Sequence, residues 1–136
     1  LAHYDISLFG KKVVVIGRSM LVGKPIAAMC LNENATVTVA HSQTPDLAAV
    51  TRLADVVIVA IGKPRFIGTN HLRDGQIVVD VGINTEVADG ARKLVGDVDY
   101  ASVRDVVAAI SPVPGGVGQM TVLALFENLI DAWCRS

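Results

Sequence analysis

KVVVIG, at residues 12–17, is a run of β-branched residues that ends in a glycine, and the turn RSMLVGKP follows it at residues 18–25. The run predicts a buried first strand, because Val and Ile suit a pleated surface that is covered on both faces. From Met20 to Asn32 apolar residues recur at helical spacing, and Pro25 stands in the first turn, where its missing N–H costs little. A strand that leads straight into a helix is the unit of a parallel α/β sheet.

Outward from this unit, the chain keeps alternating strands with helices. Further strands are expected at residues 35–40, 55–62, 76–82 and 106–110, with a strand or extended piece at 95–98. Helices are expected at 44–53, near 70–72, at 100–105 and at 121–133, with a turn at Asp89–Gly90. The pattern predicts an α/β fold: a doubly wound, mostly parallel, Rossmann-like sheet with helices on both faces. Ligands of such sheets bind at the carboxyl ends of the strands, here Gly17, His41–Ser42, Gly62, Gly82–Ile83 and Ser111–Pro112.

The composition narrows the function classes. The 136 residues suit one domain, and the 22 Val and 10 Ile among 51% hydrophobic residues suit strands buried on both faces. With 12 Lys and Arg against 13 Asp and Glu, the net charge is −1, which argues against a nucleic-acid or membrane-surface partner. No apolar run approaches the ~18–20 residues of a membrane span. Cys30 and Cys134 are expected to be buried free thiols, which favours a reducing, cytoplasmic location.

The turn at Gly17, Arg18 and Ser19 is a candidate pyrophosphate site. A glycine there lets the backbone come close to a pyrophosphate, and the following helix N-terminus offers N–H groups and a partial positive charge. The fingerprint G-x-G-x-x-G is incomplete, because Ser19 and Val22 stand at its second and third glycine positions. The alternative is a tight strand-to-helix turn with no ligand.

The end of the second predicted strand reads His41-Ser42-Gln43-Thr44, with no acidic residue. An NAD site commonly has an acid there, which binds the ribose 2′-hydroxyl and would repel a 2′-phosphate. A hydroxyl at Ser42 and the nearby Arg18 could bind that phosphate through charge-assisted hydrogen bonds. The sequence therefore favours NADP over NAD. Alternatively, Ser42 and Thr44 cap the next helix.

The loop Pro112–Gly118 has two prolines at its entry and three glycines at its exit. Such a loop presents bare backbone to a planar ligand just ahead of a helix, unless it is a plain connector. Either proline could be cis. Asp80, in a buried run, needs a loop N–H or an Arg as its partner and is expected to be structural. We find no G-x-S-x-G elbow, no P-loop and no Cys/His metal spacing, and we expect no metal.

Together these motifs resemble the bifunctional methylenetetrahydrofolate dehydrogenase/methenyltetrahydrofolate cyclohydrolase family. The matching stretches cover the chain in the family's order: GRSMLVGKP (17–25), VAHSQT (39–44), VAIGKP (59–64), VVDVGIN (78–84), VGDVDY (95–100) and SPVPGGVGQMT (111–121). The Pro/Gly stretch with its Met-Thr ending is the most specific of them. Gln119 departs from the family, which usually has Pro at that position.

The resemblance implies that residues 1–136 are the family's C-terminal, NADP-binding domain. It implies that Gly17, Arg18 and Ser19 meet the pyrophosphate, and that Ser42 meets the 2′-phosphate together with Arg18. The backbone of Ile83 would meet the nicotinamide end. The substrate-side loop that closes over cofactor and folate is matched by Pro114, Gly115 and Gly116. The whole enzyme would interconvert 5,10-methylene-, 5,10-methenyl- and 10-formyltetrahydrofolate in one-carbon metabolism, as a homodimer.

The family's N-terminal catalytic domain is absent from these 136 residues. That domain carries a Tyr-x-x-x-Lys motif, whose Lys is the principal catalytic residue of the family. Tyr100 to Arg104 has this spacing with Arg in place of Lys, and Arg cannot act as a general base at neutral pH. We therefore assign no catalytic residue and expect this chain alone to be inactive. Since the family's final helix packs toward the missing domain, apolar residues would stay partly uncovered here: Leu123, Leu125, Phe126, Leu129, Ile130 and Trp133.

Two other interpretations remain open at this point. The chain could be a stand-alone, non-catalytic nucleotide-binding module. It could also be the cofactor domain of another NADP-dependent dehydrogenase, such as the shikimate or glutamyl-tRNA reductase type, because fold alone does not fix function.

Overall fold

The computed structural model describes residues 1–88 and 90–135. Asp89 of the predicted Asp89–Gly90 turn lies outside the described residues. The elements follow in chain order: η1 (Ala2–Tyr4), β1 (Lys12–Ile16), α1 (Gly23–Asn32), β2 (Thr36–Ala40), α2 (Leu47–Arg52), β3 (Val56–Val59), η2 (Thr69–His71), β4 (Ile77–Asp80), β5 (Asn84–Ala88), β6 (Ala91–Val95), α3 (Tyr100–Val103), β7 (Ala109–Ile110) and α4 (Val117–Cys134).

The main sheet has the strand order β2-β1-β3-β4-β7, and each neighbouring pair is parallel. The chain crosses from β1 to β2 on one side and then returns to β3 on the other side of β1. The strand order therefore reverses between β1 and β3, which makes this the switch point at which doubly wound sheets bind ligands. Ile16 lies in register with Ala40 of β2 and with Val59 of β3, so the three carboxyl ends meet at one edge.

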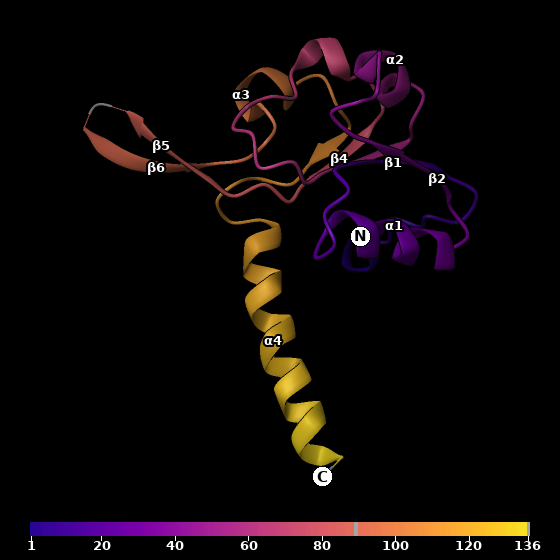
Figure 1. The fold of residues 1–136 in the computed structure, drawn as a ribbon, viewed down its shortest axis with the longest axis vertical. Helices are drawn as coiled ribbons and strands as arrows, with labels where there is room; N and C mark the ends of the chain where they lie inside the picture. Colours follow the sequence, from indigo (N-terminus) through magenta and orange to yellow (C-terminus); the bar gives the residue numbers. More distant parts are fainter. Residues whose placement is uncertain (89, 136) are drawn as a thin grey trace.

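Alternating residues of the strands feed two separate apolar cores. Val13 and Val15 of β1 pack with Ala27 and Cys30 of α1. Val14 and Ile16 face the opposite side and belong to the core that includes Val103 of α3 and packs against Leu47 and Val50 of α2. Figure 1 shows α1 on one side of the sheet and α2 and α3 on the other. The predicted doubly wound α/β fold with helices on both faces is confirmed.

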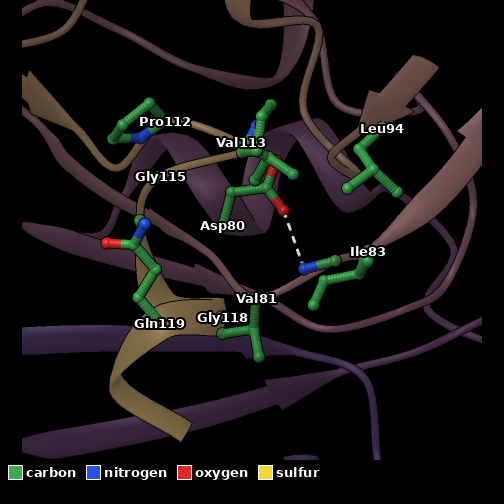
Figure 2. Close-up of a pocket in the computed structure, with 12 residues that line it drawn as sticks. Asp80, Val81, Ile83, Leu94, Pro112, Val113, Gly115, Gly118 and Gln119 are labelled. Carbon is green, nitrogen blue, oxygen red and sulfur yellow. Dashed lines mark hydrogen bonds between the residues drawn. The ribbon is translucent and has the colours of Figure 1, made fainter. Parts of the chain in front are cut away.

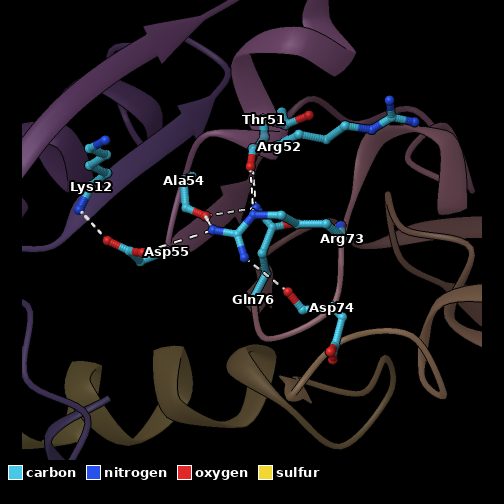
Figure 3. A network of polar contacts seen from close by, with 8 residues as sticks. All are labelled: Lys12, Thr51, Arg52, Ala54, Asp55, Arg73, Asp74 and Gln76. Carbon is cyan, nitrogen blue, oxygen red and sulfur yellow. Dashed lines mark hydrogen bonds and ion pairs between the residues drawn. The ribbon is translucent and has the colours of Figure 1, made fainter.

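The amino ends of the strands are held by a polar network beneath α2 (Figure 3). The buried Gln76 donates from Nε2 to the carbonyls of Thr51 and Ala54, at 2.7 and 2.8 Å, and accepts the N–H of Arg73 at 2.8 Å. Arg73 donates from Nε to the carbonyl of Arg52 at 2.7 Å. These donors add hydrogen bonds to carbonyl groups at and just beyond the end of α2; the carbonyl of Thr51 also accepts the N–H of Ala54 at 3.1 Å, and that of Ala54 also accepts Nη2 of Arg73 at 3.0 Å.

Two elements differ from the expectation. The antiparallel hairpin of β5 and β6 is not predicted, because the expected extended piece at 95–98 overlaps it only at Val95, although Asp-Gly between two short runs is a hairpin signal. The strand expected at 106–110 is reduced to β7, because Val106 and Val107 donate their N–H groups to the carbonyl of Val103 and continue the turn after α3. Val107 is buried there in the core rather than paired in the sheet.

The last helix begins earlier than expected, at Val117 rather than Thr121, and extends away from the sheet (Figure 1). Every residue from Gln119 to Cys134 is exposed. The apolar side chains expected to stay uncovered are 49–80% exposed: Leu123, Leu125, Phe126, Leu129, Ile130 and Trp133. Both cysteines are free, but only Cys30 is buried, and the expectation that Cys134 is buried is wrong because α4 leaves it in solvent.

Candidate functional site

The turn after β1 is shaped by two glycines. Gly17 has a φ of +119°, and a Cβ there would overlap the carbonyl of Ala60. A Cβ at Gly23 would overlap the carbonyl of Gly17, so Gly23 lets α1 start directly against the end of β1. Close helix–strand packing is the role of the third glycine in the dinucleotide fingerprint. Sequence reasoning missed Gly23 because it stands one residue after the usual position, which Val22 occupies.

Ser19 closes the first turn of α1. Its hydroxyl accepts the N–H groups of Val22 and Gly23, both at 3.2 Å, and its carbonyl accepts the N–H of Lys24 at 3.0 Å. Residues 18–21 are exposed between these fixed points. The turn thus presents backbone and the side chain of Arg18 to solvent, at the N-terminus of a ten-residue helix. Such a terminus favours an anion.

Ser42 lies at the same edge of the sheet as Arg18. Each stands two residues beyond a paired position, since Ile16 and Ala40 are in register on neighbouring parallel strands. Thr44 accepts the N–H of His41 through its hydroxyl at 2.9 Å, and Ser42 is exposed. The cap of α2 is Asp46, whose carboxylate accepts the N–H of Ala49 at 2.9 Å. The alternative that Ser42 and Thr44 cap this helix is therefore wrong.

A cavity of about 240 Å³ lies at the carboxyl ends of β4 and β7 (Figure 2). It brings together residues expected on the nicotinamide and substrate sides, namely Ile83, Pro114, Gly115 and Gly116. The remaining wall is formed by Asp80, Val81, Gly82, Leu94, Pro112, Val113, Gly118 and Gln119. Gly17, Arg18, Ser19 and Ser42 follow β1 and β2 instead. The expected residues thus form two groups along one edge of the sheet.

The Pro/Gly loop is a wall of this cavity rather than a plain connector. The Val113–Pro114 peptide bond is cis, and Gly115 has a φ of +97°. A Cβ at Gly116 would overlap the carbonyl of Pro112, so the loop folds back tightly on itself. Gly118, in the first turn of α4, leaves room for the side chain of Ile83, whose Cδ1 would lie 3.2 Å from a Cβ there. Ile83 is 61% exposed, which leaves an apolar surface for a flat ring.

Gln119 occupies the position where the resemblance leads one to expect Pro. It stands in the first turn of α4, and its N–H donates to the carbonyl of Gly116 at 3.2 Å. Gln119 also lines the cavity. Gln119 thus fits the helix entry and adds a backbone hydrogen bond that Pro, which has no N–H, could not make.

Asp80 is buried beside the cavity, and loop N–H groups are its partners. Its Oδ1 accepts the N–H groups of Gly82 and Asp97 at 2.9 and 3.1 Å, and its Oδ2 accepts that of Val98 at 2.9 Å. Burial raises the pKa of the Asp80 carboxyl above its ordinary value; these three N–H groups act to lower it, and the charge of Asp97 raises it further. A Cβ at Gly96 would overlap Oδ2 of Asp80, so a glycine is needed there.

Asp97 is a second buried carboxylate that sequence reasoning did not single out. Its Oδ2 accepts the N–H groups of Ile61 and Gly62 at 2.7 and 2.9 Å, and its Oδ1 accepts Nδ2 of Asn84 at 2.9 Å. A Cβ at Gly82 would overlap its carboxyl group. The signal in the sequence was the Gly96-Asp97 pair, in which a charge follows a glycine within a predicted extended piece.

Within residues 1–88 and 90–135, no cluster of three or more His, Cys, Asp or Glu side chains could hold a metal ion. Over the same residues, no helix is long and apolar enough to cross a membrane.

Tyr100 begins the short helix α3, and Arg104 after it pairs with the exposed Asp105 at 3.5 Å.

The whole chain, residues 1–136, matches the family model described as tetrahydrofolate dehydrogenase/cyclohydrolase, NAD(P)-binding domain. It is 53% identical over 130 residues to the bifunctional protein FolD of Cereibacter sphaeroides, an alignment that covers 96% of this chain and 44% of that protein. It is 54% identical over 127 residues to the FolD of Geobacillus kaustophilus, covering 93% and 44%. The chain thus spans less than half the length of these curated relatives.

Solved structures agree with the sequence comparison. The bifunctional FolD of Campylobacter jejuni superposes with a TM-score of 0.89 at 46% identity, covering 96% of this chain and 45% of that one. The Trypanosoma brucei enzyme, solved with NADP cofactor and an inhibitor, gives a TM-score of 0.92 at 39% identity, covering 98% and 47%.

Proposed function

The chain belongs to the tetrahydrofolate dehydrogenase/cyclohydrolase family as its NAD(P)-binding domain, and from this membership we propose that it is the NADP-binding part of a methylenetetrahydrofolate dehydrogenase/methenyltetrahydrofolate cyclohydrolase. Membership of this family excludes the interpretation that the chain is the cofactor domain of another type of dehydrogenase. When bound, NADP would supply the hydride acceptor for oxidation of 5,10-methylenetetrahydrofolate to its methenyl form, which the whole enzyme would hydrolyse to 10-formyltetrahydrofolate. The domain's part is to hold the nicotinamide face against the folate.

One observation carries the preference for NADP. The exposed turn with Arg18 and the exposed Ser42 stand at equivalent positions beyond two paired strands, which lie about 4.8 Å apart. Residues 41–44 contain no acid that would repel a 2′-phosphate. Gly17 and Ser19 then receive the pyrophosphate at the start of α1, and Arg18 with Ser42 receives the 2′-phosphate.

The cavity is the nicotinamide and folate end of the site. Its volume of about 240 Å³ is below the ~300–1,000 Å³ of pockets that enclose a whole drug-sized ligand. The cavity therefore suits one ring, that of the nicotinamide, with Ile83 on one side and the loop of Pro114, Gly115 and Gly116 on the other. The rest of the dinucleotide runs along the open sheet edge toward Arg18.

We propose that the remaining parts of the enzyme meet this domain through α4. The partner is the family's N-terminal catalytic domain in the same polypeptide, and the whole protein is a cytoplasmic homodimer that acts on tetrahydrofolate derivatives. The exposed apolar residues of α4 support a missing packing partner, and the two free cysteines support a reducing compartment. This chain alone should bind NADP and should not turn over methylenetetrahydrofolate.

The test is calorimetric titration of the chain with NADP and NAD. Arg18→Ala should weaken NADP binding ~10–100-fold, through the loss of one or two charge-assisted hydrogen bonds, and should reduce the preference over NAD. Arg104→Ala is the matched control, because that arginine pairs only with an exposed neighbour among the described contacts, and it should leave the affinity unchanged. Unchanged NADP affinity in Arg18→Ala would refute the assignment of Arg18, and a wild-type chain that binds neither nucleotide would refute the proposed function.

A further inference from the structure

Asp97 joins three segments that meet at the carboxyl edge of the sheet. Its Oδ2 accepts the N–H groups of Ile61 and Gly62, which directly follow the end of β3. Its Oδ1 accepts Nδ2 of Asn84, the residue after Ile83. Asp97 itself is fully buried and is not part of the cavity wall. All contacts described for its carboxylate therefore go to neighbouring segments rather than toward the open site.

We propose that Asp97 is a positioning residue, whose carboxylate fixes the Ile83–Asn84 connection against the end of β3 and so shapes the face on which the nicotinamide ring lies. This inference rests on the proposed function. It adds a residue that acts on the ring-binding half of the site through Ile83, without touching the ligand.

The geometry on both sides of Asp97 supports this role. Gly62 has a φ of +65°, a conformation that the backbone adopts here under two charge-assisted hydrogen bonds to the same oxygen. The backbone of Asp97 is held in turn, since its N–H donates to Oδ1 of Asp80 at 3.1 Å. The glycine at position 82 leaves the space that the Asp97 carboxyl occupies, directly before Ile83. The carboxylate thus sets the path of the chain into and out of Ile83.

The test compares two ligands on the same chain. NADP carries the nicotinamide half, whereas adenosine 2′,5′-bisphosphate has only the adenosine half with its 2′-phosphate. Asp97→Asn keeps the size of the side chain but replaces one acceptor oxygen with a donor, which cannot accept the bonds that oxygen now receives. We expect the variant to bind NADP about tenfold more weakly and the bisphosphate within about twofold of wild type.

The two ligands separate positioning from general damage. An equal loss for both ligands, or no loss for either, would overturn the positioning role while wild-type NADP binding upholds the proposed function. A wild-type chain that fails to bind NADP would overturn both. Asp105→Asn makes the same chemical change on an exposed side chain and should leave both affinities unchanged.

Two further variants keep the test informative if Asp97→Asn folds poorly. Asn84→Ala removes the bond to Oδ1 alone and leaves those of Ile61 and Gly62, so NADP affinity should fall about threefold with the bisphosphate unaffected. The exchange Asp97→Asn with Asn84→Asp lets residue 97 donate to a carboxylate at residue 84 and should restore most of the NADP affinity. NADP affinity that stays at the wild-type value in Asn84→Ala, or that falls in the exchange variant as far as it does in Asn84→Ala, would refute the role.

Discussion

At the scale of single residues, Asp80 shows how a buried charge is held by backbone alone. Three N–H groups, from Gly82, Asp97 and Val98, point at its two oxygens. The hydrophobic run around Asp80 predicted that the carboxylate needs a partner, and left a loop N–H and an Arg as alternatives. The choice could not be made from the sequence, because two of the donors come from a segment that only the folded chain brings to the end of β4.

Asp80→Asn should lower the free energy of unfolding by ~1–3 kcal/mol. The asparagine oxygen can replace Oδ1, but its NH₂ group then faces the N–H of Val98, and two donors are left without an acceptor. Urea denaturation followed by circular dichroism measures the loss. Asp105→Asn, on an exposed side chain, should change it by less than ~0.5 kcal/mol. A variant as stable as wild type would show that these N–H groups find other partners.

The pH dependence of the same comparison tests the raised pKa of Asp80. Because burial raises the pKa of this carboxyl above 3.8, the native chain takes up a proton here at a higher pH than the unfolded chain does. The free energy of unfolding therefore falls as the pH rises from the pKa of Asp80 in the unfolded chain through its higher pKa in the native chain. Relative to Asp80→Asn, the wild type should gain stability as pH is lowered from about 7 to about 4. A difference that stays constant across this range would contradict the raised pKa.

At the scale of elements, β-branched runs and strand–helix alternation were sufficient for β1 to β4 and for α1 and α2. The first turn was placed correctly because Gly17 and Pro25 bracket it. The hairpin β5–β6 was missed because its strands mix charged and apolar residues and lie outside the main sheet. Val106 and Val107 have high β propensity and were predicted to lie in a strand, but they form a helical turn because this turn buries Val107 in the core.

Substitution of Gln76 measures how much the polar network at the amino ends of the strands contributes to the free energy of unfolding. Gln76→Leu keeps the bulk of the side chain but removes the acceptor of the Arg73 N–H and one of the two donors at each of the carbonyls of Thr51 and Ala54. We expect a loss of ~2–4 kcal/mol in the free energy of unfolding. NADP affinity of the folded variant should be unchanged, because the network lies at the opposite end of the sheet from the site.

Gln43→Leu, on an exposed residue, is the control for Gln76→Leu. It should leave the urea midpoint within error. Equal midpoints for both variants would mean that water replaces Gln76 at these carbonyls without loss.

At the scale of the whole molecule, the sheet and its two cores form one body, and α4 stands out from it (Figure 1). The sequence predicted an uncovered apolar surface on this helix, because the family resemblance says what it packs toward. The direction in which α4 leaves the sheet could not be predicted, since it depends on the fold of the loop at residues 112–116. A helix with this much exposed apolar surface is a site of association.

Because these 136 residues leave the apolar face of α4 exposed, we expect this chain to self-associate through it at high concentration, and Leu125→Glu with Leu129→Glu should reduce that association. The two residues lie one turn apart on one face of α4 and are 69% and 65% exposed. Burying two leucines contributes roughly 3–6 kcal/mol, so their loss should weaken the association constant well over tenfold in sedimentation velocity experiments. Leu53→Glu changes an equally exposed leucine at the end of α2 and should have no effect. Unaltered self-association in the double variant would place the contact elsewhere.

Asp80 and Asp97 pack directly against Gly96 and Gly82, and this packing limits which substitutions the sequence can accept during evolution. Asp80 fills the space that a side chain at position 96 would need, and Asp97 fills the space at position 82. A larger residue at position 96 must await loss of Asp80, whereas at position 82 the backbone nitrogen of Asp97 would block a Cβ whatever side chain stands at position 97. Loss of either acid leaves without an acceptor the N–H groups that it serves. Each route of single steps passes through a less stable intermediate, so positions 80 and 96 should be inherited as a linked pair and position 82 should stay glycine.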